Sequence, residues 1–250
     1  MLKFRHSGVL FLTFLMRKST TFVILKRIRI YREYNMKLHI FHFLEMLLGI
    51  TSLSAGAAMG IIAGLGQTTS TGTCSAIAGA LGIKVGTAMI LLYGFFLVLQ
   101  LLMLRNKFKI SGFLQLVPVV IQGWILNFFK YDFPPFQALA PQSYPERFVI
   151  FAIGMVLISF GFTCVKCSRF VNYPPETFCS LVAERIGIRF GTSKIALDFV
   201  YVGTSLLLCW LCGLDFGIVR EGTVIFAVCN GLLINLFQPR VEQIFRKIDQ

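Results

Sequence analysis

The chain contains the heptad Leu81-Gly82-Ile83-Lys84-Val85-Gly86-Thr87, and 105 positions later a second version of it, Ile186-Gly187-Ile188-Arg189-Phe190-Gly191-Thr192. The same offset relates Gly49 to Gly154, Ser54 to Ser159 and Gly56 to Gly161. With three further residues inserted, Gln122, Gly123 and Asn127 correspond to Asn230, Gly231 and Asn235. The two halves of the chain are therefore copies of one unit.

The composition is that of a membrane protein. Hydrophobic residues make up 56% of the chain and charged residues 14%, and the mean hydropathy is +0.76. Apolar runs near 20 residues recur, and a helix needs about that many to cross roughly 30 Å of hydrocarbon. The runs predict an all-α polytopic membrane protein with six transmembrane helices at 46–65, 85–104, 112–129, 148–165, 195–211 and 223–237. A short extra helix is expected after the first span of each half, at 74–81 and between Pro174 and Ile186.

Each half holds three spans, and an odd number places the second copy upside down in the membrane. Such inverted repeats are typical of many transporters. Basic residues gather in the 105–109 loop, after the fourth span and in the tail, and cytoplasmic loops carry this excess. The sequence thus predicts a bacterial cytoplasmic membrane protein with both termini inside.

The predicted organisation has five segments. A basic N-terminal arm (1–44) precedes membrane repeat 1 (45–130), an external linker (131–147), membrane repeat 2 (148–238) and a cytoplasmic tail (239–250). Nine of the 24 Lys and Arg residues lie in the first 40 positions, so the net charge of +13 is not spread as in a nucleic-acid-binding protein. The arm either lies on the anionic membrane surface or precedes the native start, which we expect at Met36.

A glycine-rich first span, a polar break, a short helix that ends in Gly-Ile-x-x-Gly-Thr, and a later duplicate resemble the YczE/YyaS/YitT-type bacterial integral membrane proteins. The match covers about residues 46–238. It is carried by Gly56, Gly64, Gly66, Leu81 to Thr87, Pro174, Ile186 to Thr192, Asp198 and the Gly217-Ile218 to Gly222-Thr223 segment. Thr68 and Thr69 stand where the family often has proline. The resemblance implies a six-span membrane protein without a settled substrate.

No catalytic or metal-binding constellation is apparent. His6, His39 and His42 all precede the first span, so none supplies an intramembrane base or ligand. The cysteine pairs Cys164/Cys167 and Cys209/Cys212 are expected at opposite membrane faces, too far apart for one zinc ion. We therefore expect no enzyme activity, no metal and no cofactor.

Asp198 is the main candidate for a substrate or ion pathway, because a charge inside a span is costly unless paired or hydrated. Lys194 lies one helical turn earlier and is a ready partner, so a purely structural ion pair is the alternative. Tyr93 is the counterpart of Asp198 in the first half. Any role for the carboxylate is therefore asymmetric.

Two further groups of polar positions follow the repeat. Gln122, Asn127, Asn230 and Asn235 either line a cavity or form interhelical hydrogen bonds. The short helices either dip into the membrane, with N-termini that favour an anion or a polar group, or lie flat at its surface. Glu184 and Arg185 favour the flat arrangement for the second one.

The first span carries Gly56, Gly60 and Gly64 at four-residue spacing, and Gly161 lies in the equivalent span of the second half. Such a small-residue face permits close helix packing, within the chain or against a homodimer or membrane partner. We expect a secondary transporter or export permease for a small molecule, with a midplane site between the repeats. The alternative is a non-transporting accessory or substrate-capture subunit that acts through a partner.

Overall fold

The computed structural model describes residues 40–139, 141–168 and 172–248. The chain divides into Met1–Phe43 and Leu44–Gln250, and the fold below is that of the second unit. The proposed arm and the alternative start at Met36 lie outside the described residues, except for the arm's last five positions.

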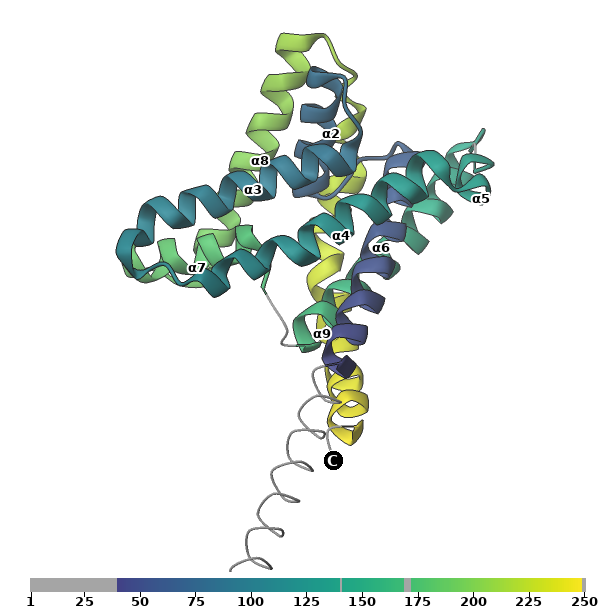
Figure 1. Ribbon diagram of the computed structural model, residues 1–250. Coiled ribbons are helices and arrows are strands. Elements are labelled where there is room, and N and C mark those ends of the chain that lie inside the picture. Colours follow the sequence, from purple (N-terminus) through teal and green to yellow (C-terminus); the bar gives the residue numbers. More distant parts are fainter. Residues whose placement is uncertain (1–39, 140, 169–171, 249–250) are drawn as a thin grey trace, which may run out of the picture. The chain divides into compact units, whose positions relative to one another are not determined.

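Within these residues the chain is all-helical (Figure 1). The first span, Ile40–Ala63, leads into α2 (Thr69–Leu81) and α3 (Val85–Leu104). Short 3-10 turns η1 (Arg105–Lys107) and η2 (Ile110–Gln115) precede α4 (Leu116–Asn127), the π turn η3 (Phe128–Asp132) and α5 (Pro134–Gln137). The second half has α6 (Tyr144–Ser168), α7 (Pro174–Ile186), α8 (Phe190–Cys212), η4 (Phe216–Ile218) and α9 (Glu221–Ile248).

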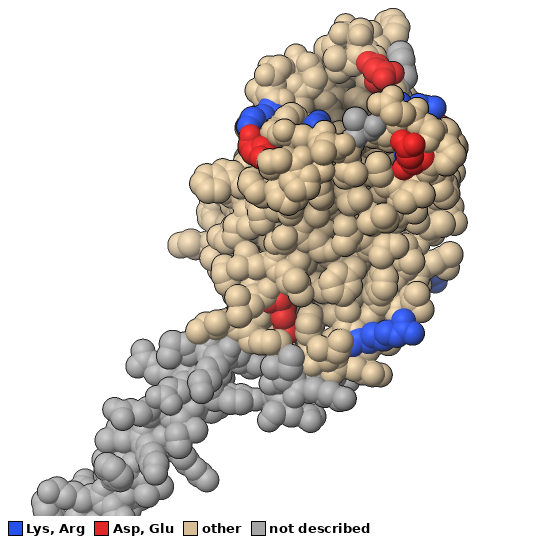
Figure 2. All heavy atoms as spheres, turned by 90° about the vertical axis from the view of Figure 1, so that its right-hand side faces the viewer, with Lys and Arg blue, Asp and Glu red and all other residues tan. Residues whose placement is uncertain are grey.

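Six of these helices are long and apolar enough to cross a membrane, which confirms the predicted all-helical protein with six spans. They are the first span, α3, the η2–α4–η3 stretch, α6, α8 and α9. Figure 2 shows Lys, Arg, Asp and Glu gathered near two ends of one face, with an uncharged band between them. This distribution matches a hydrocarbon layer between two polar surfaces.

The repeated heptad is a helix stop followed by a helix start. Gly82 and Gly187 end α2 and α7 in the left-handed region, with φ of 66° and 78°, which favours glycine. The Ile83 and Ile188 amides then donate to Ala78 and Ala183 at 3.0 Å. Val85 and Phe190, two residues after these isoleucines, begin α3 and α8.

The short helix α2 begins earlier than the expected 74–81. The Thr68 hydroxyl accepts a hydrogen bond from the Thr71 amide at 3.1 Å and caps the helix. Threonine is a weak helix former in the interior but a good N-cap. The polar break therefore supplies the cap and first turn of α2 rather than a loop.

The first span packs closely against α6. A Cβ at Gly56 would lie 2.5 Å from the Gly154 carbonyl oxygen, and one at Gly161 would lie 2.5 Å from that of Gly49. Gly49 and Gly154 are repeat equivalents, as are Gly56 and Gly161. Gly49 thus faces Gly161, the equivalent of Gly56, and Gly56 faces Gly154, the equivalent of Gly49. Between the two glycines of the first span, the Ser52 hydroxyl donates to the carbonyl of its own equivalent, Leu157, at 2.8 Å.

Gly60 and Gly64 do not make the close contact with α6 that Gly56 makes. Gly60 is buried, but a Cβ there would meet nothing within 4 Å. Gly64 follows the end of the helix, in a turn with φ of 66°. The close approach therefore uses Gly49 and Gly56, seven residues apart, because that spacing returns to the same helix face.

Candidate functional site: a central cavity

A cavity of about 630 Å³ lies among all six spans and both short helices. Its volume is in the usual range for small-molecule sites, about 300–1,000 Å³. The lining residues from the first half are Leu53, Ala57, Thr68, Thr69, Ser70, Thr71, Met89, Tyr93 and Gln122. Those of the second half include Ile158, Phe162, Tyr173, Glu176, Lys194, Asp198, Tyr201, Thr223 and Asn230.

Both short helices direct their N-termini at this cavity. Thr69 to Thr71 open α2, and Pro175 and Glu176 lie in the first turn of α7. A helix N-terminus presents unpaired amides and a partial positive charge. The sequence favoured a flat α7, yet its N-terminus borders the cavity just as that of α2 does.

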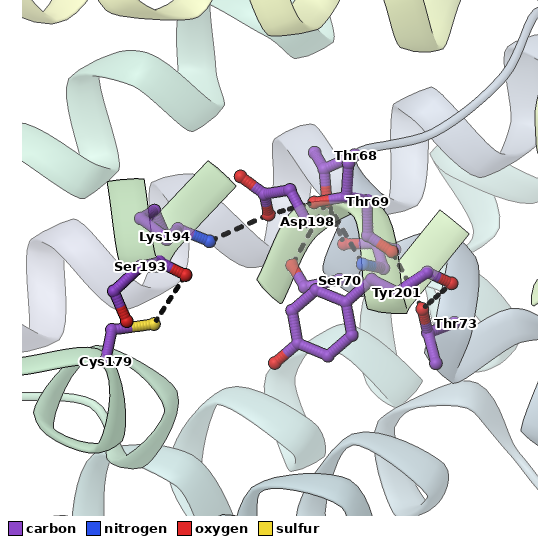
Figure 3. Close-up of polar contacts among 10 residues, drawn as sticks. Thr68, Thr69, Ser70, Thr73, Cys179, Ser193, Lys194, Asp198 and Tyr201 are labelled. Atoms are coloured by element: carbon purple, nitrogen blue, oxygen red, sulfur yellow. Dashed lines mark hydrogen bonds and ion pairs between the residues drawn. The ribbon is translucent and has the colours of Figure 1, made fainter. Parts of the chain in front are cut away.

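The Lys194–Asp198 pair lies at the edge of the cavity. The Lys194 ammonium is 2.9 Å from the Asp198 carboxylate, and the Thr69 hydroxyl donates to the same oxygen at 2.7 Å (Figure 3). This second bond joins α8 to the N-terminus of α2. Both charged side chains are about one-third exposed, so the pair is reachable from the cavity.

Deeper in the molecule, Thr73 continues the contact between α2 and α8. Its hydroxyl donates to the Tyr201 carbonyl at 2.9 Å and lies 3.1 Å from the Ser205 hydroxyl. Tyr93, the counterpart of Asp198, meets Tyr173 edge-to-face at 6.0 Å. Asp198 and Tyr93 therefore both border the cavity, one from each half.

Four of the lining residues each carry a buried polar atom that has no hydrogen-bond partner within the described part of the chain. These atoms are the Gln122 Oε1, the Tyr173 and Tyr201 hydroxyls and the Thr223 Oγ1. These side chains are between 2% and 7% exposed. An unsatisfied buried group costs about 1–3 kcal/mol, so a molecule or water that reached these groups from the cavity would recover part of that cost.

The amide positions have different surroundings. Gln122 and Asn230 border the cavity, and Asn230 also accepts from the Ser159 hydroxyl at 2.8 Å. Asn127 instead links α4 to α3, since it accepts from the Gly86 amide at 2.8 Å and its own amide donates to Thr87 at 3.4 Å. Asn235 is exposed.

The two halves differ at their last two spans. A Cβ at Gly86 would collide with the Gly123 carbonyl oxygen, so α3 and α4 are in backbone contact. The equivalent Gly191 of α8 and Gly231 of α9 are exposed, with nothing described within 4 Å of a Cβ. The residues that join α3 to α4 are thus repeated on α8 and α9 without making the same contact.

The cavity opens between α8 and α9. Four of its lining residues are also largely exposed: Ile195 at 60%, Phe199 at 75%, Val224 at 68% and Val228 at 63%. All four are apolar, and both helices are candidate spans. The opening therefore faces the region of the lipid chains.

Comparison with known proteins gives a family. The model of a family of unknown function, DUF6198, matches residues 40–239. The chain belongs to this family. It is 23% identical to the uncharacterised protein YyaS of Bacillus subtilis over 198 residues. This match covers 79% of the present chain and 92% of YyaS. It is also 23% identical over 163 residues to the uncharacterised membrane protein YczE of that organism, over 65% and 69% of the two chains. No solved structure shows a significant match.

The DUF6198 assignment agrees with the resemblance seen in the sequence, and several residues that carried it meet in space. The Gly222 amide donates to the Leu65 carbonyl at 2.8 Å. A Cβ at Gly66, where φ is 111°, would lie 2.7 Å from the Thr223 hydroxyl. These glycines let the turn after the first span lie against the start of α9.

Tyr173, Glu176, Tyr201 and Thr223 line the cavity but were not among the candidates from the sequence, and Glu176 is the charged one. Glu176 follows Pro174 and Pro175 at the start of a helix, and its position in the repeat matches Thr71, in the polar break. Burial raises the pKa of its carboxyl, and the positive charges of Lys194 and Lys166 partly oppose this. That equivalence was the available signal.

Proposed function

We propose that this membrane protein is a secondary transporter or export permease for a small molecule, built from two inverted three-span repeats around the central cavity. The observation that carries the proposal is the difference between the two halves. Gly86 and Gly123 bring α3 and α4 into backbone contact, while the equivalent Gly191 and Gly231 on α8 and α9 have nothing described within 4 Å of a Cβ. Alternating access needs two such arrangements of one site.

The contact between the first span and α6 supports the inverted relation. When two copies of one unit pack in antiparallel fashion, contacts are reciprocal. If residue A of the first copy contacts the equivalent of residue B in the second copy, residue B of the first copy contacts the equivalent of residue A. Gly49 with Gly161 and Gly56 with Gly154 follow this rule, and Ser52 bonds to its own equivalent, Leu157. The helix pairs agree as well, because α2 packs on α8 as α7 packs on α3.

In the proposed cycle, α8 and α9 approach through Gly191, Gly231 and Asn235 while α3 and α4 separate. The cavity then opens on the other side of the pseudo-symmetric molecule. Asp198 and Lys194 are the proposed ion or substrate contacts, and Tyr93, Gln122 and Asn230 also line the cavity. This cycle requires no chemical step. We further propose that the protein lies in a bacterial cytoplasmic membrane with both termini on the cytoplasmic side.

No observation favours the alternative, an accessory subunit that docks through the glycines of the first span. Gly56 is covered by α6, Gly60 is buried, and Gly64 lies in a turn. Of the three glycines on which that alternative depended, Gly56 is in close contact within the chain.

A lock on the α3–α4 contact tests transport. In a variant whose native cysteines are replaced, Thr87→Cys with Asn127→Cys joins two side chains that are hydrogen-bonded in the structure. We expect untargeted metabolite profiles of cells and medium to show a solute whose distribution depends on the protein. Oxidation of the lock should abolish this dependence and a reductant should restore it. If no solute responds to the protein, or the oxidised lock remains fully active, the proposal is wrong.

A further inference from the structure

The cavity has a polar interior and an apolar opening, and this combination restricts what it binds. The unpaired Gln122 Oε1, Tyr173 hydroxyl, Tyr201 hydroxyl and Thr223 Oγ1 come from both halves and point to a hydrogen-bonding ligand. The opening between α8 and α9 has Ile195, Phe199, Val224 and Val228 at its edges. A water-soluble solute would have to cross this lipid-facing gap, whereas an amphipathic molecule reaches it by diffusion within the bilayer.

The charges around the cavity restrict the head group. In the described part of the chain, Lys194, Asp198 and Glu176 are the charged side chains of the lining. Lys194 and Asp198 neutralise each other at 2.9 Å, and Thr69 donates to the same carboxylate. Burial raises the pKa of Glu176, which favours its neutral form. A head group with a full charge would therefore lose its hydration with at most the Glu176 carboxyl as a counter-charge.

We propose that the ligand is an amphipathic molecule whose uncharged, hydrogen-bonding head occupies the central cavity and whose hydrocarbon chain leaves through the opening between α8 and α9. Gln122 accepts a hydrogen bond from the head, and the hydroxyls of Tyr173, Tyr201 and Thr223 donate to it or accept from it. The chain packs along the apolar edges of α8 and α9. This inference deepens the proposed function. That the ligand is transported rests on the proposed function, whereas its binding is measured independently.

Photo-crosslinking in lipid nanodiscs tests the ligand class with the full chain. The probe is an octyl glucoside that carries a diazirine near the end of its chain, and labelled peptides are mapped by mass spectrometry. Three competitors share the eight-carbon chain and differ in the head: octyl glucoside, octyltrimethylammonium and octyl sulfate. We expect labelling of Ile195, Phe199, Val224 and Val228 that octyl glucoside suppresses at least tenfold better than either charged analogue.

Two variants test the head contacts, and a third is the matched control. Tyr201→Phe and Thr223→Val keep the shape and remove one unpaired hydroxyl each, so each should weaken competition by octyl glucoside about fivefold. Trp210→Phe lies on α8 but is 71% exposed and outside the cavity lining, so it should leave competition unchanged. Gel filtration identifies any variant that has failed to fold, and the remaining variant still decides the question.

Three results would overturn the inference. Equal competition by the charged analogues would contradict the uncharged head. Labelling spread evenly over lipid-facing residues such as Leu91 and Phe95 of α3, without competition, would mean bilayer partition or a water-filled cavity. Unchanged competition in both hydroxyl variants would remove the head contacts. If the probe binds as expected but the α3–α4 lock has no effect on any solute, the proposal of transport is wrong and the proposed binding site is retained.

Discussion

Gly56 and Gly60 lie one turn apart on the first span, and the structure predicts opposite responses to the same substitution. In Gly56→Ala the new methyl would lie 2.5 Å from the Gly154 carbonyl oxygen and 2.9 Å from the Ile158 amide nitrogen. Both atoms are backbone, and ordinary contact begins near 3.4 Å. The first span and α6 must therefore move apart by several tenths of an ångström along a tightly packed seam.

Such overpacking typically costs about 1–3 kcal/mol. At about 2–4 °C per kcal/mol for a chain of this size, the melting temperature in detergent should fall by about 2–12 °C. Gly60→Ala adds the same methyl where nothing lies within 4 Å. It should be neutral or slightly stabilising, because alanine is favoured over glycine in a helix by about 1 kcal/mol.

Thermal unfolding of the purified variants, followed by intrinsic fluorescence, measures both effects under one condition. Gly60→Ala that is as destabilising as Gly56→Ala would refute the assignment of the seam. A neutral Gly56→Ala would show that the first span and α6 are not in backbone contact.

Three other predictions concern charge and topology. Asp198→Asn leaves the Lys194 ammonium without its partner and should lower the melting temperature by a few degrees. Lys194→Met combined with Asp198→Asn should restore the melting temperature. If the double variant does not recover, the carboxylate has a role beyond the ion pair. Because burial raises the pKa of Glu176 above its ordinary 4.5, the folded state holds this proton more tightly, so stability should fall as pH rises from about 4.5 through the raised pKa. Glu176→Gln should flatten that part of the profile, and an unchanged profile would contradict the assignment. Reporters fused after Asn106 and at the C-terminus should read cytoplasmic and one after Gln137 external, and an external reading after Asn106 would break the six-span topology.

The repeated heptad made much of the fold predictable. It combines a glycine that must adopt positive φ with the start of the next span, so α2, α3 and α7 end or begin where the motif requires. Span lengths followed from apolar runs, and their ends differed where polar or charged residues continue a helix. Tyr144 to Arg147, for example, form the first turn of α6.

The details of the site were less predictable. The glycine spacing identified a packing face, but only the crossing of the first span with α6 decides that Gly56 is in contact and that a Cβ at Gly60 is not. Glu176 resembled an ordinary acid at a helix start, because its burial depends on distant elements. The difference between α3–α4 and α8–α9 could not be read from the sequence, since both pairs carry the same residues.

A disulfide test of α8 and α9 addresses the central claim most directly. In a chain without native cysteines, Thr192→Cys with Asn235→Cys occupies the positions equivalent to Thr87 and Asn127, whose side chains are hydrogen-bonded in the structure. If the two halves exchange conformations, this pair should form a disulfide in membranes, as should Thr87→Cys with Asn127→Cys. With all four substitutions present, oxidation of one pair should suppress oxidation of the other. Rapid oxidation of the α3–α4 pair with no oxidation of the α8–α9 pair would mean a fixed asymmetric molecule and would contradict the account.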